Sequence, residues 1–155
     1  MQYSLISSIK VPWFATLGVS DILRGRVEAY LPLQHKPTSY TITVTFRGYY
    51  EKDWAWRFAK LTIRPDLKFN IISQRLVIEV LDVQFERTRA QTAGYFHGEE
   101  LVTIGHVDLQ WQPHQSVNAC CGPTRFEVTE DRDPPFDAIL GYEDSSRHNL
   151  LREGR

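Results

Sequence analysis

The side chains of this sequence that are most able to react or to bind a metal are its cysteines and histidines. The two cysteines are neighbours, Cys120 and Cys121. A disulfide between adjacent residues needs a strained ring and the chain has no other cysteine, so we expect two thiols in a reducing compartment. His97, His106 and His114 fall in one region but lack the CxxC or HExxH spacing of a metal site. We therefore expect no metal ion and no cofactor.

The sequence signal for a hydrolytic catalytic triad is equally weak. Ser73 with His97 or His106 and Asp108 contains the residue types of a catalytic triad, but no GxSxG elbow accompanies Ser73. Adjacent acids such as Glu99 and Glu100 are most simply solvated faces of the protein. The residue types therefore predict no triad.

Composition narrows the class of protein. The chain has 155 residues, of which 42% are hydrophobic and 24% charged, so it suits one packed domain, or one domain with an extension. A net charge of −1 gives no basic field for nucleic acid, and no apolar run is long enough to cross a bilayer. The start, MQYSLISSIKVPWF, lacks the charged and apolar regions of a signal peptide. We expect an intracellular protein, cytoplasmic or nuclear, that binds neither nucleic acid nor membrane.

Strand-like alternation dominates the chain. YTITVTF, Tyr40–Phe46, is the clearest strand, with threonines on one face and larger side chains on the other. WAWRFAKLTI, Trp54–Ile63, is a second strand, whose apolar phase shifts midway as a bulge or a change of covered face would produce. Two tryptophans on one strand face, even beside Lys52 and Arg57, are more typical of a core than of a surface that stacks bases.

The other expected elements are short. Strands are expected at Val27–Leu31, Leu81–Phe85, Arg125–Glu130 and Phe136–Gly141, and in a hairpin that turns at His97–Gly98. Helices are expected from a Ser73 cap through Val80 and over Glu143–Arg152, and loops at Arg47–Asp53, Glu86–Thr92, Gln112–Gly122 and Asp131–Pro135. Residues Met1–Asp21 read as a loose arm or an added edge strand. The total is about eight strands and two short helices, which makes the class mainly β.

The order of these parts resembles the retropepsin-like fold, that of the single-lobe aspartic proteases of retroviruses and retroelements. The likeness covers about Trp56 to Leu151 and rests on FDAILG, FNIIS and TAGYFHGEELVTIGHVDLQW. These resemble the family's glycine-ended strand, the segment after its catalytic loop, and its flap with the following strand. The resemblance implies a closed small β-barrel in which Gly141 lies beside the active-site loop, where only glycine permits close backbone approach.

The catalytic motif of that family is absent. Its enzymes carry Asp-Thr/Ser-Gly, and two such aspartates share a proton to activate water. Counting back from Asn70 places Arg64, Pro65 and Asp66 at those three positions. An arginine does not give up its proton near neutral pH and cannot act as the base. Asp66 itself reads as a local ion pair or a turn residue, with a displaced catalytic role as the fallback.

These observations leave three functions open. The first is a catalytically inactive retropepsin-like domain, retroelement-derived, that binds an extended peptide or protein segment as an added strand, with a homodimer as a further option. The second is an active aspartic peptidase that uses Asp66. The third is an unrelated β-sandwich that binds a ligand. The residues expected to line the peptide groove are Arg64, Asp66, His97, Gly98, Leu140 and Gly141.

The domain boundary follows from the resemblance. Residues 54–155 form the retropepsin-like domain, and residues 1–53 are an extension that packs on the barrel or contributes strands to it. The strong Tyr40–Phe46 strand lies in that extension. It either pairs with an exposed sheet edge or supplies the first strand of the fold.

Overall fold

The computed structural model describes residues 38–50, 53–115 and 121–152. The strand expected at Val27–Leu31 and the arm expected at Met1–Asp21 lie outside these residues. The structure is mainly β. Its elements are β1 (Tyr40–Tyr50), β2 (Asp53–Ile63), β3 (Ile71–Ile72), η2 (Leu76–Val80), β4 (Glu86–Phe96), β5 (Glu99–Pro113), β6 (Cys121–Thr129), β7 (Ala138–Leu140) and α2 (Tyr142–Arg147).

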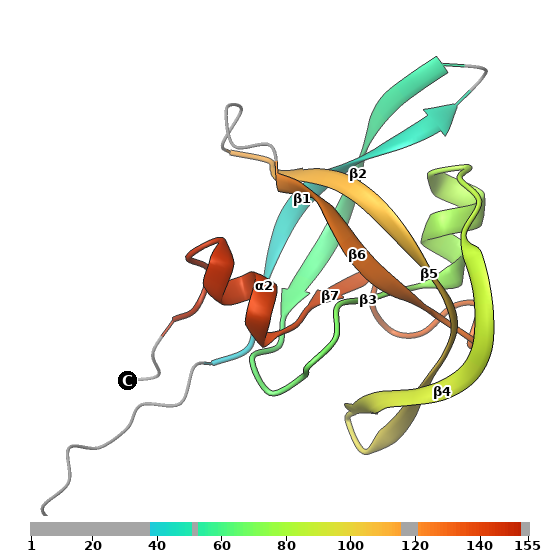
Figure 1. The fold of residues 1–155 in the computed structure, drawn as a ribbon. Helices are drawn as coiled ribbons and strands as arrows, with labels where there is room; N and C mark the ends of the chain where they lie inside the picture. The colour runs from blue at the N-terminus through green and yellow to red at the C-terminus, as the bar shows by residue number, and fades with distance from the viewer. Residues whose placement is uncertain (1–37, 51–52, 116–120, 153–155) are drawn as a thin grey trace, which may run out of the picture. The chain divides into compact units, whose positions relative to one another are not determined.

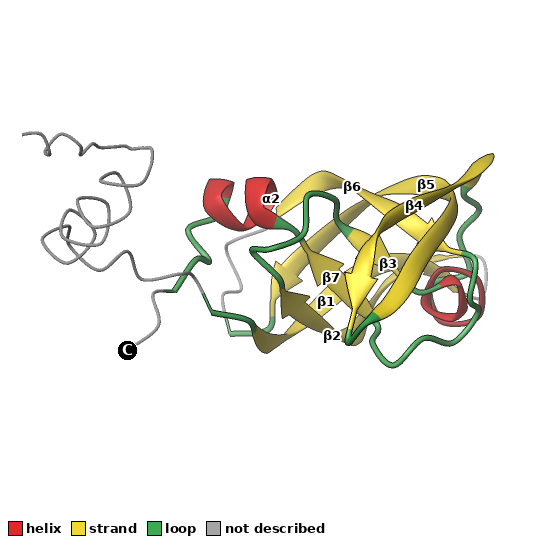
Figure 2. Cartoon of the chain, turned by 90° about the horizontal axis from the view of Figure 1, so that it is seen from below, coloured by secondary structure: helices red, strands yellow, loops and turns green. Residues whose placement is uncertain are grey.

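The described strands form one mixed sheet in the order β1-β2-β7-β3-β6-β5-β4 (Figure 1). β1 also pairs with the end of β5, through Val44–Phe46 and Trp111–Pro113. The pairings therefore return to the strand from which they started, and β4 lies outside this circuit. The strands curve around a common interior, with α2 and η2 at opposite ends (Figure 2). Since β1 is a full member of the sheet, residues 40–50 contribute a strand rather than packing on the sheet from outside.

The first two strands differ from the sequence-based expectation. The loop expected at Arg47–Asp53 is wrong over Arg47–Tyr50, which continue β1. The bulge in β2 is also wrong, because its eleven residues pair with β1 in an unbroken register. Ala59, Leu61 and Ile63 face the core, whereas Trp54, Trp56 and Phe58 face outward. The apolar periodicity of the sequence shifted only because large aromatic side chains occupy the exposed face of the first half of β2.

Two further assignments are corrected. Glu86–Thr92, expected as a loop, forms most of β4, an edge strand whose first seven residues are exposed. Leu81–Phe85, expected as a strand, has no strand pairing; Leu81 has helical backbone angles and Asp82 has a φ of 51°. Gly48 fits against the backbone of Leu81, and Tyr49 N donates to Leu81 O at 2.7 Å. The alternation at Leu81–Phe85 therefore comes from packing rather than from a sheet.

The remaining elements follow the prediction with shifted ends. The hairpin turns at His97–Gly98, where both residues have left-handed backbone angles. The Ser73 hydroxyl accepts from Leu76 N at 3.2 Å and caps the helical segment that ends at Val80. The loop expected at Gln112–Gly122 is shorter, because β5 runs to Pro113 and β6 begins at Cys121. The last helix, α2, is also shorter than expected and ends at Arg147.

Two apolar clusters hold these elements together. The larger one fills the space between the strands and centres on Phe46, Trp111 and Phe126. The smaller one joins the β4–β5 hairpin to the segment after β2; its members are Leu67, Ile71, Ala93, Phe96, Leu101, Phe136 and Ile139. This second cluster lies at the position where the sequence placed the candidate site.

Candidate functional site

The candidate site is a crossing between the turn after β2 and the end of β7. β7 lies between β2 and β3, parallel to the first and antiparallel to the second. Arg64 N donates to Leu140 O at 2.9 Å, and Tyr142 N donates to Leu67 O at 2.9 Å. The contact that the sequence predicted between the Arg64 turn and the Gly141 end of the last strand is therefore confirmed.

Gly141 is required by space at this crossing. A Cβ atom at Gly141 would lie 2.8 Å from the carbonyl oxygens of Leu67 and Phe69, and 3.1 Å from the carbonyl carbon of Lys68. The φ angle of Gly141 is −78°, which any residue adopts. Close approach of two backbones, and not an unusual φ, makes a side chain unacceptable here.

Asn70 ties three segments together beneath the crossing. Its side-chain oxygen accepts from Gly141 N at 2.9 Å, and its side-chain nitrogen donates to Arg125 O at 2.9 Å and to the Asp144 carboxylate. Asn70 is buried, so these bonds satisfy groups that water does not reach. Sequence reasoning used Asn70 only to count positions. The available signal was a polar residue between two apolar ones, Phe69 and Ile71.

Arg64 and Asp66 form a two-pronged ion pair across the turn. Arg64 Nε and Nη2 donate to the two oxygens of Asp66 at 2.7 and 2.5 Å. The hydrogen bond from Arg64 is the main cause that lowers the pKa of the Asp66 carboxyl, and the same bond raises the pKa of Arg64. Asp66 therefore stays a charged acceptor bound to a cation. This is the local ion pair that the sequence suggested, and it supplies no proton donor near neutral pH.

The tip of the β4–β5 hairpin folds onto this turn. The Phe96 ring is buried against Phe136 at a centroid distance of 5.0 Å, and the Arg64 guanidinium lies 5.2 Å from the centre of the Phe96 ring. Gly94 comes so close to Leu67 that an added Cβ would lie 2.7 Å from the Leu67 Cδ2 atom. Leu67 and Phe96, which the sequence did not single out, therefore fill the space between hairpin and turn.

The six predicted groove residues fall into three environments. Arg64 and Asp66 pair with each other in the turn, and Gly141 lies against the Leu67–Phe69 backbone of the same turn. His97 and Gly98 are exposed at the hairpin tip, where the His97 ring stacks edge-on against Phe96. Leu140 is fully buried in the larger core cluster.

The histidines and Ser73 serve other contacts. His106 Nε2 lies 3.0 Å from a Glu86 oxygen, and the His114 ring stacks against Phe58. The Ser73 hydroxyl is occupied as a helix cap, and Asp108 is paired with Arg125 through two bonds of 2.9 and 3.0 Å. Within the described ranges, no three His, Cys, Asp or Glu residues gather as a metal site.

Two of the cavities that the described residues form open on the surface, and neither is lined by Arg64 or Gly141. One, of about 700 Å³, runs beside the hairpin tip and has an apolar part from Phe96, Leu101 and Phe136. Its rim carries four acids, Glu99, Glu100, Glu130 and Asp131. Arg132 at the same rim is paired with Glu79, which lies outside the lining.

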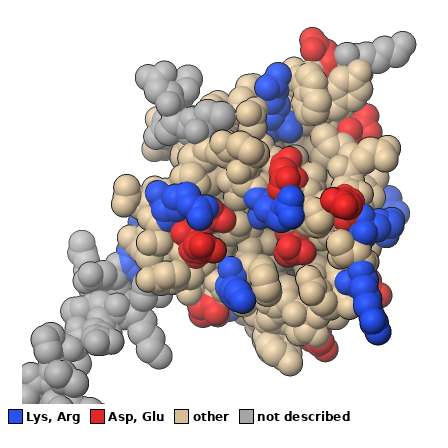
Figure 3. Space-filling model, in the orientation of Figure 1, with Lys and Arg blue, Asp and Glu red and all other residues tan. Residues whose placement is uncertain are grey.

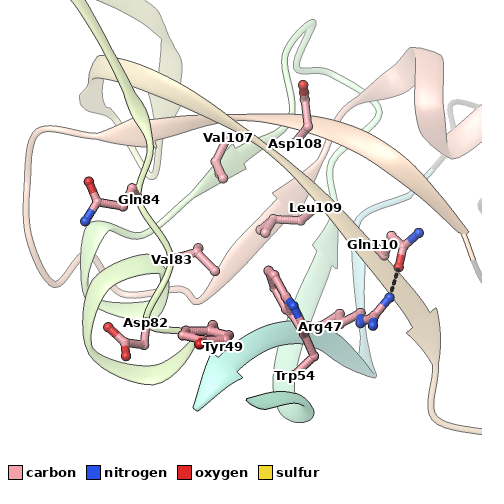
Figure 4. A pocket seen from close by; sticks show the side chains of 10 residues that line it. All are labelled: Arg47, Tyr49, Trp54, Asp82, Val83, Gln84, Val107, Asp108, Leu109 and Gln110. Carbon is pink, nitrogen blue, oxygen red and sulfur yellow. Dashed lines mark hydrogen bonds between the residues drawn. The ribbon is translucent and has the colours of Figure 1, made fainter. Parts of the chain in front are cut away.

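The second cavity, of about 690 Å³, opens where β4 has left the edge of β5 and β1 has not yet joined it (Figure 4). Val83, Val107 and Leu109 contribute its apolar surface. Tyr49 and Trp54 pack edge to face at 5.3 Å on its other side. Arg47 stacks on Trp54 and donates to the Gln110 amide oxygen at 3.2 Å.

Charges of both signs are interspersed on the face shown in Figure 3, which carries no extended field of one sign. Of the helices in the described part of the chain, none has the length and apolarity that a bilayer crossing needs.

No protein-family model, no curated protein and no solved structure matches this chain.

Proposed function

We propose that the chain is a catalytically inactive retropepsin-like domain that acts inside the cell by binding an extended polypeptide. In this proposal the circuit of strand pairings is a closed small β-barrel, β4–β5 is the flap, and the Arg64 turn occupies the place of the catalytic loop. The support is the crossing of that turn with a glycine-ended strand, followed directly by a helix.

The observation that carries the lack of catalysis is the Arg64–Asp66 ion pair. An aspartic protease needs two carboxyls close enough to share one proton. At this crossing a guanidinium takes the position of the acid and holds the adjacent Asp66 in its charged form. A site of this kind binds and orients polar groups but does not activate water.

The structure offers a binding surface beside the hairpin. The cavity along the hairpin tip combines an apolar part with four acidic side chains, which suits an extended peptide that carries basic side chains. A peptide that lay under the hairpin would have to separate Leu67 from Gly94 and Phe96 from Arg64. We therefore propose that binding begins along the cavity and is completed by opening of the hairpin.

The two alternatives have less support. A peptidase that uses Asp66 would need to free its carboxylate from Arg64 and to bring a second acid within reach. An unrelated β-sandwich would not require the crossing at Gly141, which is present.

The test is an NMR titration of isotope-labelled protein with a library of extended peptides, in which the amide signals of Arg64, Phe96 and His97 are monitored. We expect basic peptides to shift these signals, and we expect the double substitution Glu99→Gln with Glu130→Gln to weaken binding about tenfold. Glu143→Gln, at an exposed glutamate of α2 away from the cavity, is the matched control. Unchanged signals around His97 and Arg64 with every peptide would refute the proposal.

A further inference from the structure

The second edge of β2 lies open along most of the strand. β2 pairs with β1 over its whole length, whereas β7 covers its other edge only at Leu61–Ile63. Among the described residues, no strand pairs with the stretch Asp53–Lys60 on that side. The far end of the β1–β2 hairpin projects beyond the other strands in Figure 1.

Two carboxylates show which backbone groups point toward this edge. Trp54 N donates to Asp53 Oδ1 at 2.7 Å, and Lys60 N donates to Asp137 Oδ2 at 2.9 Å, so both N–H groups point away from β1. The direction of backbone groups alternates along a strand with a period of two. The N–H and C=O groups of Trp56 and Phe58 must therefore point to the open edge, between the two carboxylate-capped ends.

The side chains next to these groups are large, aromatic and exposed. Trp54 is 52% exposed, Trp56 40% and Phe58 64%. They form a row on the outer face of β2, two residues apart. Exposed aromatic patches of this kind mark interaction surfaces more often than they occur by chance.

The other edge strand of the sheet is protected in the usual way. The outer edge of β4 carries the exposed charges Glu86, Arg87 and Arg89, and charged edge strands discourage pairing with another chain. The open stretch of β2 also carries charges, Asp53, Arg57 and Lys60, but its outer face from Trp54 to Phe58 is aromatic.

We propose that a second copy of this chain pairs antiparallel with β2, with the two-fold axis at Trp56. In this register Trp56 N donates to the partner's Trp56 O, and Phe58 N donates to the partner's Trp54 O. The two-fold axis repeats both bonds, so all four open N–H groups find acceptors. Any register shifted by one residue would set N–H groups that point outward against groups that point inward.

Side chains also fit this register. On the outer face Trp56 meets the partner's Trp56, and Trp54 meets the partner's Phe58, so only aromatic side chains meet along the row. On the inner face Ala55 lies opposite the partner's Arg57, and Asp53 is a diagonal neighbour of the same arginine. Over Asp53–Ala59, the described residues that pair in this register, no like charges face each other, whereas an axis at Arg57 would set two guanidiniums opposite one another.

The size of the contact predicts a weak dimer. The exposed parts of three aromatic side chains amount to roughly 300 Å² for each copy. That area is below the size of stable specific interfaces, so the association is weak and transient. The dimer therefore forms at micromolar or higher concentrations and goes beyond the proposed peptide binding, because it uses the opposite end of β2 from the Arg64 turn.

Sedimentation velocity over about 5 to about 500 µM protein tests this pairing, because that range covers dissociation constants in the micromolar region. We expect a concentration-dependent shift from monomer to dimer. Trp56→Lys sets two ammonium groups on the axis and is expected to raise the dissociation constant at least tenfold. Tyr95→Lys, at a 59% exposed aromatic on the charged edge strand, is the matched control and is expected to change nothing.

Oxidative cross-linking tests the register separately. Residues opposite each other in a hydrogen-bonded antiparallel pair have Cα atoms about 5.5 Å apart, within the range of a disulfide. We expect Trp56→Cys to form a covalent dimer, and Trp54→Cys, which faces the partner's Phe58, to do so far less; the parent protein is the blank. A monomer at every concentration, equal effects of Trp56→Lys and Tyr95→Lys, or equal cross-linking of the two cysteine variants would overturn the proposal.

Discussion

Replacing Gly141 by alanine tests the backbone crossing, and its effect can be worked out from the geometry. The new methyl group would lie 2.8 Å from two carbonyl oxygens and 3.1 Å from a third backbone atom. None of these atoms belongs to a flexible side chain, so the backbone itself has to move. Inserting one carbon into a packed site costs about 1–3 kcal/mol, and we expect a value near 3 kcal/mol because rigid backbone surrounds Gly141.

Urea unfolding followed by tryptophan fluorescence measures this loss. With a slope of about 1.5 kcal/mol per molar urea, the midpoint of Gly141→Ala falls by about 2 M. Gly98→Ala is the matched control, because no atom lies within 4 Å of a Cβ placed there, although its φ is +85°. We expect only the strain of a left-handed alanine, about 1 kcal/mol. A Gly141→Ala protein as stable as Gly98→Ala would refute the crossing.

Three further predictions concern buried polar and titrating groups. Asn70→Ala leaves Gly141 N–H without its acceptor and is expected to lower the free energy of unfolding by about 3 kcal/mol, measured in the same urea titration. Asp66 has a lowered pKa in the folded state, so its stabilising effect is present above its ordinary pKa of 3.8 and is lost as the pH falls through the lowered value. The stability difference between the parent and Asp66→Asn should therefore stay below about 1 kcal/mol, because Asp66 is exposed, and should shrink below pH 3.8. Burial, and secondarily the charge of Arg147, lowers the pKa of His148, whose ring stacks on Trp111 at 5.3 Å. The NMR titration midpoint of His148 should therefore lie below 6.5. The contribution of neutral His148 to stability should be lost as the pH falls from 6.5 through that midpoint. A midpoint at or above 6.5 would contradict this assignment.

The crossing was expected from the resemblance to a known fold, and not from the local residues alone. The resemblance of FDAILG and FNIIS to the retropepsin-like fold implied that the strand ending at Gly141 passes beside the Arg64 turn. The Arg64–Asp66 pair was also within reach, since opposite charges two residues apart in a turn meet readily. The hairpin at His97–Gly98 followed from its turn residues.

The errors in the expected strands and loops share one physical cause. The periodicity of a sequence shows where apolar side chains recur, but it does not show which face of a strand another element covers. Trp54 and Trp56 resembled core residues, yet they lie on the exposed face of β2, where Tyr49 and His114 pack against the neighbouring rings of Trp54 and Phe58 without burying them. Glu86–Thr92 resembled a loop because these residues of the edge strand are all exposed to solvent, so their sequence shows no apolar alternation. The buried contacts of Leu67 and Phe96 depend on a hairpin that folds back over the turn, which local sequence does not encode.

The Arg64 turn is proposed to bind a peptide without hydrolysing it. The most direct measurement is a cleavage assay with extended peptides that bind in the NMR titration, run from about pH 3 to about pH 7, the range in which an aspartate pair is active. We expect intact peptide at every pH with the parent protein and with Asp66→Asn alike. Cleavage at acid pH that disappears in Asp66→Asn would contradict this proposal.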